Sequence, residues 1–135
     1  MSNIKRFPKE PTLFAQMLGV EKLGSYDPIT KTYSCNIDFL NDQAVNFFRT
    51  LHGGAIMGLL DDICGITIYF CYGVNSAVTI NAKTFFYKPI RPSSSIEITC
   101  QIIKEEGKEI IIEAVLESSN EMVAKMTAVW ERRCK

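Results

Sequence analysis

The sequence predicts an α+β fold in which one antiparallel sheet of five to six strands is wrapped around one long central helix. Apolar residues recur at three- and four-residue spacing through residues 53–72, whereas they alternate with polar residues in one run before this segment and in four runs after it. A chain of 135 residues, 47% of them hydrophobic, also has the size of one ordinary domain with one core. We therefore expect a single domain over residues 1–135.

The first expected element is a short helix that begins at residues 11–12 and runs to about Gly19 or Gly24. A Pro-Thr pair favours a helix start, and glycine favours a helix end. Its apolar stripe would contain Leu13, Met17 and Leu18. Residues 33–39 then alternate between apolar and polar side chains, which predicts a half-buried strand, and a polar loop is expected at residues 41–43.

The long helix is expected to begin at Gly53 or Gly54 and to end near Tyr72, with Gly73 as its stop signal. The residues that carry its helical spacing are Ile56, Leu59, Leu60, Ile63 and Cys64. Further apolar residues near its C-terminal end extend around most of the circumference, so we expect other structure to surround this helix.

Four strands are expected after the helix, at residues 76–88, 95–104, 109–118 and 121–132. The last two connections, at residues 106–108 and 119–120, are short enough for antiparallel hairpins. On the last strand, one face carries Met122, Ala124, Met126, Ala128 and Trp130. On the strand before it, one face carries Ile110, Ile112, Ala114 and Leu116.

Charge and composition disfavour several classes of partner. Fifteen basic and fifteen acidic residues cancel, and the basic pairs at residues 5–6 and 132–133 are too short to follow a phosphate backbone. We therefore expect no nucleic-acid partner. Two aspartates lie near the middle of the most apolar segment, which argues against a membrane span, and the N-terminus does not resemble a secretory signal.

Five cysteines form no CxxC pair, and their odd number cannot be fully paired within one chain. A reducing cytoplasm fits this pattern best, with the thiols buried as small hydrophobic groups. A zinc site would need a second histidine or another thiol close in sequence to these cysteines, and the chain has neither, so we expect no metal site. No cofactor is expected either.

The only histidine, His52, precedes Gly53 and Gly54, and the acidic pair Asp61-Asp62 follows within an apolar stretch. A carboxylate among apolar side chains costs several kcal/mol unless it is paired or used. Glycines at a helix N-terminus present free backbone N–H groups and the positive end of the helix dipole to a developing oxyanion. Asp61 could attack a thioester carbon or take a proton from water. Thioester hydrolysis suits this equipment, because a thiolate with a pKa of roughly 8.5 leaves with little protonation.

Spacing adds a constraint on this chemistry. Eight residues of helix separate Gly53 from Asp61, about 12 Å at 1.5 Å per residue. The two groups of one chain cannot touch the same carbonyl. A two-fold homodimer with antiparallel central helices would bring Asp61 of one subunit toward the Gly53 end of the other.

Three segments of the chain together match one known signature: Asn-Phe-Phe-Arg-Thr-Leu-His-Gly-Gly at residues 46–54, Leu60-Asp61, and the strand end at residues 86–89. This signature resembles that of the hotdog-fold acyl-CoA thioesterases, in the phenylacetyl-CoA thioesterase-like (PaaI-like) branch. The resemblance implies a hotdog fold and hydrolysis of an acyl-CoA or related thioester by a homodimer, which in this family often pairs into a tetramer.

The resemblance also implies roles for single residues. Asp61 would be nucleophile or general base, the Gly53 N–H would polarise the carbonyl, and His52 and Asn46 would lie near the thioester. Thr79 would hold the attacking water. Further candidates for substrate binding are Gly54, Met57, Phe86, Lys88 and Arg91, the last two for coenzyme phosphates.

Each role has a structural alternative. Asp62 could be the inward acid instead of Asp61. His52 could cap the helix or bind a backbone carbonyl and have no catalytic role. Asn46 could be a turn residue and Thr79 an ordinary strand threonine. The aromatic side chains Phe47, Phe48, Phe85 and Phe86 favour core positions over an acyl pocket. Three other functions also stay open: a non-catalytic acyl-CoA-binding hotdog protein, a hotdog enoyl-CoA hydratase or dehydratase, and a purely structural interaction module.

Overall fold

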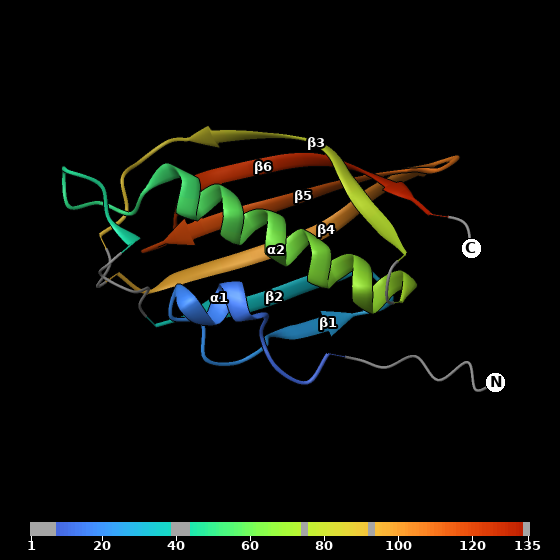
Figure 1. Ribbon diagram of the computed structural model, residues 1–135, viewed down its shortest axis with the longest axis horizontal. Coiled ribbons are helices and arrows are strands. Elements are labelled where there is room, and N and C mark those ends of the chain that lie inside the picture. The colour runs from blue at the N-terminus through green and yellow to red at the C-terminus, as the bar shows by residue number, and fades with distance from the viewer. Residues whose placement is uncertain (1–7, 39–43, 74–75, 92–93, 134–135) are drawn as a thin grey trace.

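The computed structural model describes residues 8–38, 44–73, 76–91 and 94–133. The elements in chain order are α1 (Leu13–Met17), β1 (Ser25–Asp27), β2 (Thr32–Ile37), α2 (Gly53–Tyr72), β3 (Ala77–Phe86), β4 (Ile96–Glu106), β5 (Glu109–Ser118) and β6 (Glu121–Arg132). The strands form one antiparallel sheet in the order β1-β2-β4-β5-β6-β3. This sheet curves around α2, and α1 packs beside the N-terminal half of α2 (Figure 1). The α+β architecture predicted from the sequence is confirmed.

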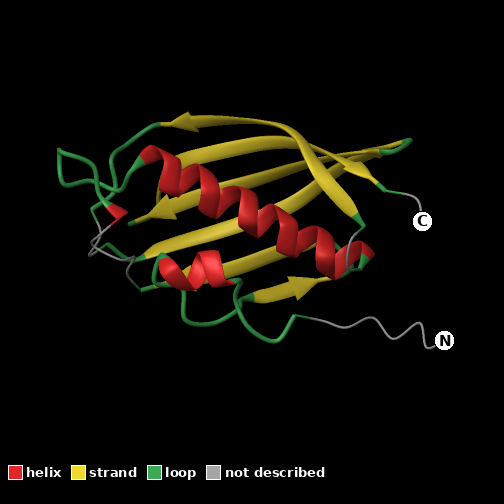
Figure 2. Cartoon of the chain, viewed as in Figure 1, coloured by secondary structure: helices red, strands yellow, loops and turns green. Residues whose placement is uncertain are grey.

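The long helix α2 has the bounds that its periodicity predicted, and Gly73 follows it with a φ of 97°. Its buried residues lie on the side that faces the sheet: Ile56, Leu59, Leu60, Ile63, Cys64, Ile66, Thr67 and Ile68. Burial of each large apolar side chain contributes about 1.5–3 kcal/mol to folding. The helix is long and apolar enough by composition to cross a membrane. Here, however, the helix lies against the sheet (Figure 2), and eight of its residues are buried.

The expectation that other structure surrounds α2 is wrong within the described residues. Gly54 and Met57 are exposed, and Asp61 and Asp62 are only partly buried. The sheet covers one side of the helix and α1 covers part of another, so a strip of the helix surface stays open. This open strip lies between β3 on one side and α1 on the other (Figure 1).

Strands β5 and β6 match their predicted bounds, and their inner faces form the centre of the core. The predicted inner residues of β5 are fully buried, as are Ala124 and Ala128 of β6. Met122 is an exception, because it is 43% exposed. The register shifts between Leu116 and Glu117, and Val123 takes the buried position instead.

The edge strand β3 contains an irregularity that decides which of its side chains face α2. The register with β6 shifts between Thr79 and Asn81, so the strand gains one residue there. Thr79 lies opposite Trp130, and Phe86 lies opposite Ala124, and both of these partners are buried under α2. Because paired residues share a face, Thr79 and Phe86 both point toward α2, although an odd separation would place them on opposite faces of a regular strand.

The N-terminal region matches the predictions in part. Helix α1 ends at Met17, and Gly19, the nearer of the two expected helix ends, follows with a φ of 103°. Its buried residues are Ala15 and Leu18, whereas Leu13 and Met17 are 79% and 72% exposed. Strand β1 was missed, because three residues are too few to show alternation. Phe39 and the loop at residues 41–43 lie outside the described residues.

Three of the cysteines behave as small hydrophobic residues. Cys35, Cys64 and Cys100 are buried, and burial raises the pKa of the Cys35 thiol to about 12. The sulfur atoms of Cys64 and Cys100 lie 3.8 Å apart and join α2 to β4. Cys71 is partly exposed, and Cys134 lies outside the described residues.

Gly24 precedes β1 at a close approach between backbone segments, which gives a test of the N-terminal packing. A Cβ atom at Gly24 would lie 1.9 Å from the Ser34 carbonyl oxygen. We therefore expect Gly24→Ala to lower the free energy of unfolding, measured by urea denaturation, by roughly 2–3 kcal/mol. The control is Gly107→Asn, because Gly107 has a φ of 60° that asparagine tolerates and nothing lies within 4 Å of its Cβ position. Equal stability of the two variants would contradict the close approach.

Candidate active site

Asp61 and Thr79 meet where α2 passes β3. The Thr79 hydroxyl donates a hydrogen bond to Asp61 Oδ1 at 2.9 Å. Asp61 is partly buried, so its carboxylate is held in place and is still reachable from the open strip of α2. The sequence placed Thr79 beside Asp61 by the family resemblance alone, and the structure brings the two side chains together. Their catalytic roles stay a prediction.

Asp62 faces the other way, toward α1. The Thr12 hydroxyl donates to Asp62 Oδ1 at 2.9 Å. Burial raises the pKa of Asp62 above its ordinary value; the Thr12 hydrogen bond opposes this shift, and the nearby charge of Asp61 adds to it. Neither of the two acids is fully buried. Consecutive helix positions point about 100° apart, so Asp61 faces β3 and Asp62 faces α1.

At the N-terminus of α2, His52 acts as the helix cap. Its Nδ1 atom accepts a hydrogen bond from the Gly54 N–H at 2.9 Å. The capping alternative for His52 is thus what the structure shows, and the Gly54 N–H is already used. The Gly53 N–H has no hydrogen-bond acceptor among the described residues. It therefore stays available to a substrate oxygen.

Phe86 lies beside this helix end. Its ring is 3.6 Å from the position that a Cβ atom would take on Gly53, and the side chain is 47% exposed. The structure thus brings Gly53 and Phe86 together at one end of the open strip, while Asp61 and Thr79 meet farther along it. Because Gly53 carries no side chain, an aromatic ring and a backbone N–H share this small space.

Asn46 shapes the turn that leads to the helix. Its Oδ1 atom accepts from the backbone N–H groups of Phe48 and Thr50, at 2.9 and 3.2 Å. Its own backbone N–H donates to the Thr50 carbonyl at 2.9 Å. The structure therefore shows the turn role that the sequence left open. It provides no contact between Asn46 and Asp61 within the described residues.

Of the remaining substrate-binding candidates, Met57 lies one helix turn before Asp61, whereas Lys88 and Arg91 follow β3. Met57 is on the exposed side of α2, 40% exposed. Lys88 forms an exposed ion pair with Glu121, and Arg91 is exposed.

The prediction of core positions for four phenylalanines is wrong. The exposed fractions of these residues are 105% for Phe47, 85% for Phe48, 45% for Phe85 and 47% for Phe86. The first two lie in the turn before α2, and the other two are on the edge strand, where no second strand covers them within the described residues. The sequence predicts burial for an apolar side chain, because the hydrophobic pattern does not show which strand lies at the edge of the sheet.

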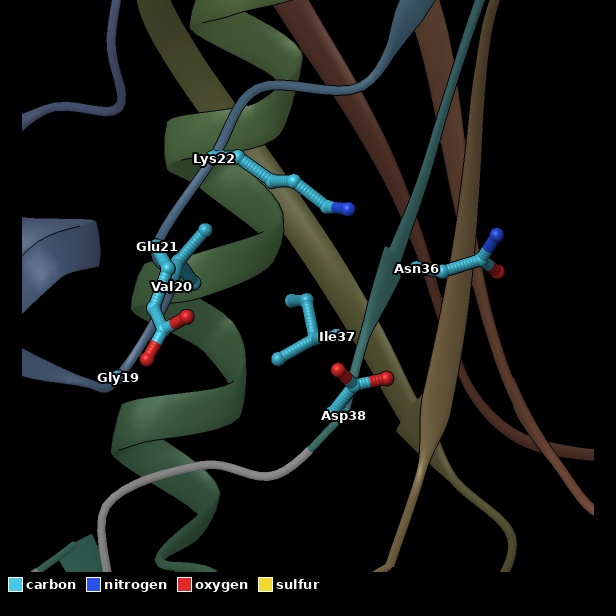
Figure 3. A pocket seen from close by; sticks show the side chains of 7 residues that line it. All are labelled: Gly19, Val20, Glu21, Lys22, Asn36, Ile37 and Asp38. Atoms are coloured by element: carbon cyan, nitrogen blue, oxygen red, sulfur yellow. The ribbon is translucent and has the colours of Figure 1, made fainter.

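Two cavities lie away from these residues. One, of about 130 Å³, lies between residues 19–22 and residues 36–38, where Ile37 points toward the facing loop (Figure 3). The other, of about 650 Å³, lies at the C-terminal end of α2, and its lining includes Tyr26, Phe70 and Tyr72. Neither is lined by Asp61 or Gly53. Among the described residues, no three His, Cys, Asp or Glu side chains are grouped as metal ligands.

The raised pKa of Asp62 gives a pH test of its surroundings. The folded protein holds the Asp62 proton more tightly than the unfolded chain does. Below the ordinary pKa of 3.8, this difference therefore contributes to the free energy of unfolding. The contribution is lost as the pH rises through the higher pKa that Asp62 has in the folded protein. Asn at this position does not ionise and still accepts from Thr12. We expect the free energy of unfolding of Asp62→Asn, relative to the natural protein, to increase from about pH 4 to pH 7.

Urea denaturation at several pH values measures this difference. The exposed carboxylate of Glu97 provides the control, as Glu97→Gln. A difference between Asp62→Asn and the natural protein that stays constant with pH would show that burial does not favour the protonated acid.

Comparison with known proteins finds relatives both in sequence and in structure. The chain is 31% identical over 122 residues to the acyl-coenzyme A thioesterase THEM4 of Mus musculus; this match covers 90% of the chain and 50% of the relative, so the chain spans about half of that relative's length. Among solved structures, it is similar to a variant of the phenylacetic acid degradation protein PaaI from Thermus thermophilus, with a TM-score of 0.78 and 16% identity over 90% of this chain and all of that one.

A second solved structure, smu.793 from Streptococcus mutans bound to acetyl CoA, has a TM-score of 0.72 and 17% identity, and the match covers 100% of this chain and 97% of that chain. These likenesses confirm the predicted hotdog fold. Residues 48–125 match the family model of the thioesterase superfamily. The fold, the element order and this match together establish that the chain belongs to the thioesterase superfamily.

Proposed function

We propose that the protein hydrolyses acyl-CoA thioesters to a free acid and coenzyme A. The observation that carries this proposal is the hydrogen bond from Thr79 to Asp61, which holds a carboxylate at the edge of an open helix surface. The superfamily match supports thioester chemistry, and the names of the relatives support the carrier: one is an acyl-coenzyme A thioesterase, and another is bound to acetyl CoA.

Asp61 would act as general base or as nucleophile. The Thr79 hydroxyl uses its single proton on Asp61 Oδ1, so the second carboxylate oxygen stays free for water and the Thr79 oxygen can accept a bond from that water. As base, Asp61 takes a proton from water while the water oxygen bonds to the carbonyl carbon. The C–S bond then breaks, and the thiolate receives the proton. As nucleophile, the carboxylate attacks the carbonyl carbon, the C–S bond breaks and the thiolate leaves, and water then cleaves the resulting anhydride to the free acid and the Asp61 carboxylate.

The oxyanion would be stabilised at the N-terminus of α2. The Gly53 N–H is available there, and the helix dipole adds positive potential. The His52 cap supports this role indirectly, since it fixes the first turn by binding the Gly54 N–H. Phe86 would lie beside the acyl group at this end. Arg91 is the candidate for coenzyme phosphates, whereas Lys88 is already paired with Glu121.

The distance along α2 requires a second subunit in this proposal. Gly53 and Asp61 are about 12 Å apart on one helix, so Asp61 would work with Gly53 of the partner subunit. Within the described residues β3 pairs with β6 alone, so its other edge has no strand partner, and two apolar side chains of this strand are exposed, Val78 by 39% and Ile80 by 50%. Antiparallel pairing of β3 with its copy would cover this edge and bring the two helices together.

Two wider statements belong to the same proposal. A dimer of dimers would cover the outer face of the sheet, where the rings of Phe85 and Tyr87 stack with centroids 6.4 Å apart. A cytoplasmic location fits the thiols without CxxC spacing.

Release of thiol from a panel of acyl-CoAs tests the function. Turnover of at least one substrate supports hydrolysis. Tight binding without turnover would favour the acyl-CoA-binding alternative, and hydration of an enoyl-CoA without thiol release would favour the hydratase.

Substitution of Asp61 tests the assigned chemistry. We expect Asp61→Asn to lower kcat/KM by about 100-fold or more, because the amide neither accepts a proton nor attacks the carbonyl. Thr79→Val should lower it by roughly tenfold, since the carboxylate loses its orienting donor. The matched control is Asp62→Asn, which keeps its acceptor for Thr12 and should retain turnover. Equal losses at positions 61 and 62 would contradict the assignment.

Mixed dimers test the shared site. Gly53→Pro removes the N–H, and proline is well accepted at the first helical position after His52, whose φ of −61° and ψ of 132° suit a residue before proline. Each single variant should be inactive as a homodimer. Heterodimers that combine Asp61→Ala with Gly53→Pro should regain up to one working site of two. Absence of recovery, with heterodimers verified by mass spectrometry, would count against a site made by two subunits.

A further inference from the structure

Helix α1 holds an aromatic ring on the open strip of α2. A Cβ atom at Gly58 would lie 2.7 Å from the tip of the Phe14 ring, so the ring fills the space that a side chain at position 58 would need. Phe14 is nevertheless 41% exposed. One side of the ring therefore contacts α2, while another side stays open to a ligand.

This ring lies close to the proposed reaction centre. Gly58 is three residues before Asp61 and four before Asp62, and such positions share one helix face, about one turn apart. The ring thus lies roughly 5 Å along the helix axis from the two acids. An apolar group attached to a carbonyl at Asp61 would reach the ring within a few carbon atoms.

Thr12 and Asp62 fix the position of α1. The Thr12 hydroxyl accepts the Ala15 N–H at 3.1 Å and donates its proton to Asp62 Oδ1 at 2.9 Å. One side chain therefore caps α1 and ties it to α2, two residues before Phe14. Ala15, on another side of this short helix, is buried in the core.

We propose that Phe14 is a specificity-determining residue that contacts the acyl chain of the substrate, and that the Thr12–Asp62 hydrogen bond is the contact that positions it. This inference rests on the proposed function and names its substrate class: thioesters of apolar acyl groups several carbons long. An acetyl group is too short to reach the ring from Asp61. A longer chain gains binding by covering the open side of the ring.

Binding of non-hydrolysable thioethers tests this contact without turnover. The probes are S-decyl-CoA and S-ethyl-CoA, measured by calorimetry with the full chain. We expect Phe14→Ala to weaken S-decyl-CoA binding by roughly fivefold to tenfold and S-ethyl-CoA binding by less than about twofold. The matched control is Leu13→Ala, which shortens the neighbouring side chain of α1, 79% exposed, and should change neither affinity.

The positioning role has its own variants. Thr12→Val removes both hydrogen bonds and should weaken S-decyl-CoA binding selectively, as Phe14→Ala does, whereas Thr12→Ser keeps both bonds and should restore it. If Phe14→Ala proves unstable, Gly58→Ala moves the ring without deleting it and should show the same selectivity for the long chain.

The outcomes separate the two proposals. Equal weakening of both probes, or of neither, by Phe14→Ala would overturn the acyl contact even in an active thioesterase. Selective weakening of S-decyl-CoA in a protein that hydrolyses no acyl-CoA would support the contact and reject hydrolysis. Failure of the natural protein to bind S-decyl-CoA would overturn the acyl contact, whereas hydrolysis would be rejected only by the absence of thiol release from the whole panel of acyl-CoAs.

Discussion

The packing of α2 on the sheet fixes the rotation of the helix about its own axis, and the candidate site depends on that rotation. Eight buried side chains hold one side of α2 against the sheet. With that side fixed, consecutive residues on the opposite side must point about 100° apart. Asp61 therefore meets β3, and Asp62 meets α1. The hydrophobic core thus decides which of two identical acids can approach a substrate at the strand edge.

The two acids are satisfied in the same manner by different elements. Each accepts a hydrogen bond of 2.9 Å from a threonine hydroxyl, Thr79 for Asp61 and Thr12 for Asp62. This arrangement partly compensates two neighbouring carboxylates that are both partly buried. The consequence for Asp62 is a raised pKa, chiefly from burial. The consequence for the site is that α1, a helix of five residues, is tied to the helix that carries Asp61.

The extra residue in β3 extends the site along the strand. Thr79 near Asp61 and Phe86 near Gly53 share the face toward α2 because the register shifts between them. A regular strand would turn one of them to the outer face. The same strand is one of the two edges of the sheet within the described residues, so the side that carries the candidate site is also a side open to a partner. In the proposed dimer, closure of this edge and completion of the site would be one event.

The sequence by itself determined the class of fold, the bounds of α2, β5 and β6, and the pairing of a glycine-started helix with an acid nine residues after His52. These features depend on periodicity and on capping, which are local properties of the chain. The role of Asn46 in a turn and of His52 in a cap was also local, yet the sequence left each beside a catalytic alternative.

Only the tertiary structure decided which face of each element is covered. Several features depend on neighbours distant in sequence. They are the pairing of the short β1, the exposure of Phe47 and Phe48, the burial of Val123 in place of Met122, and the ion pair of Lys88 with Glu121. The meeting of Thr79 with Asp61 depends on a register shift that no composition reveals. Periodicity states that a face is apolar, whereas strand order and register determine what lies against it.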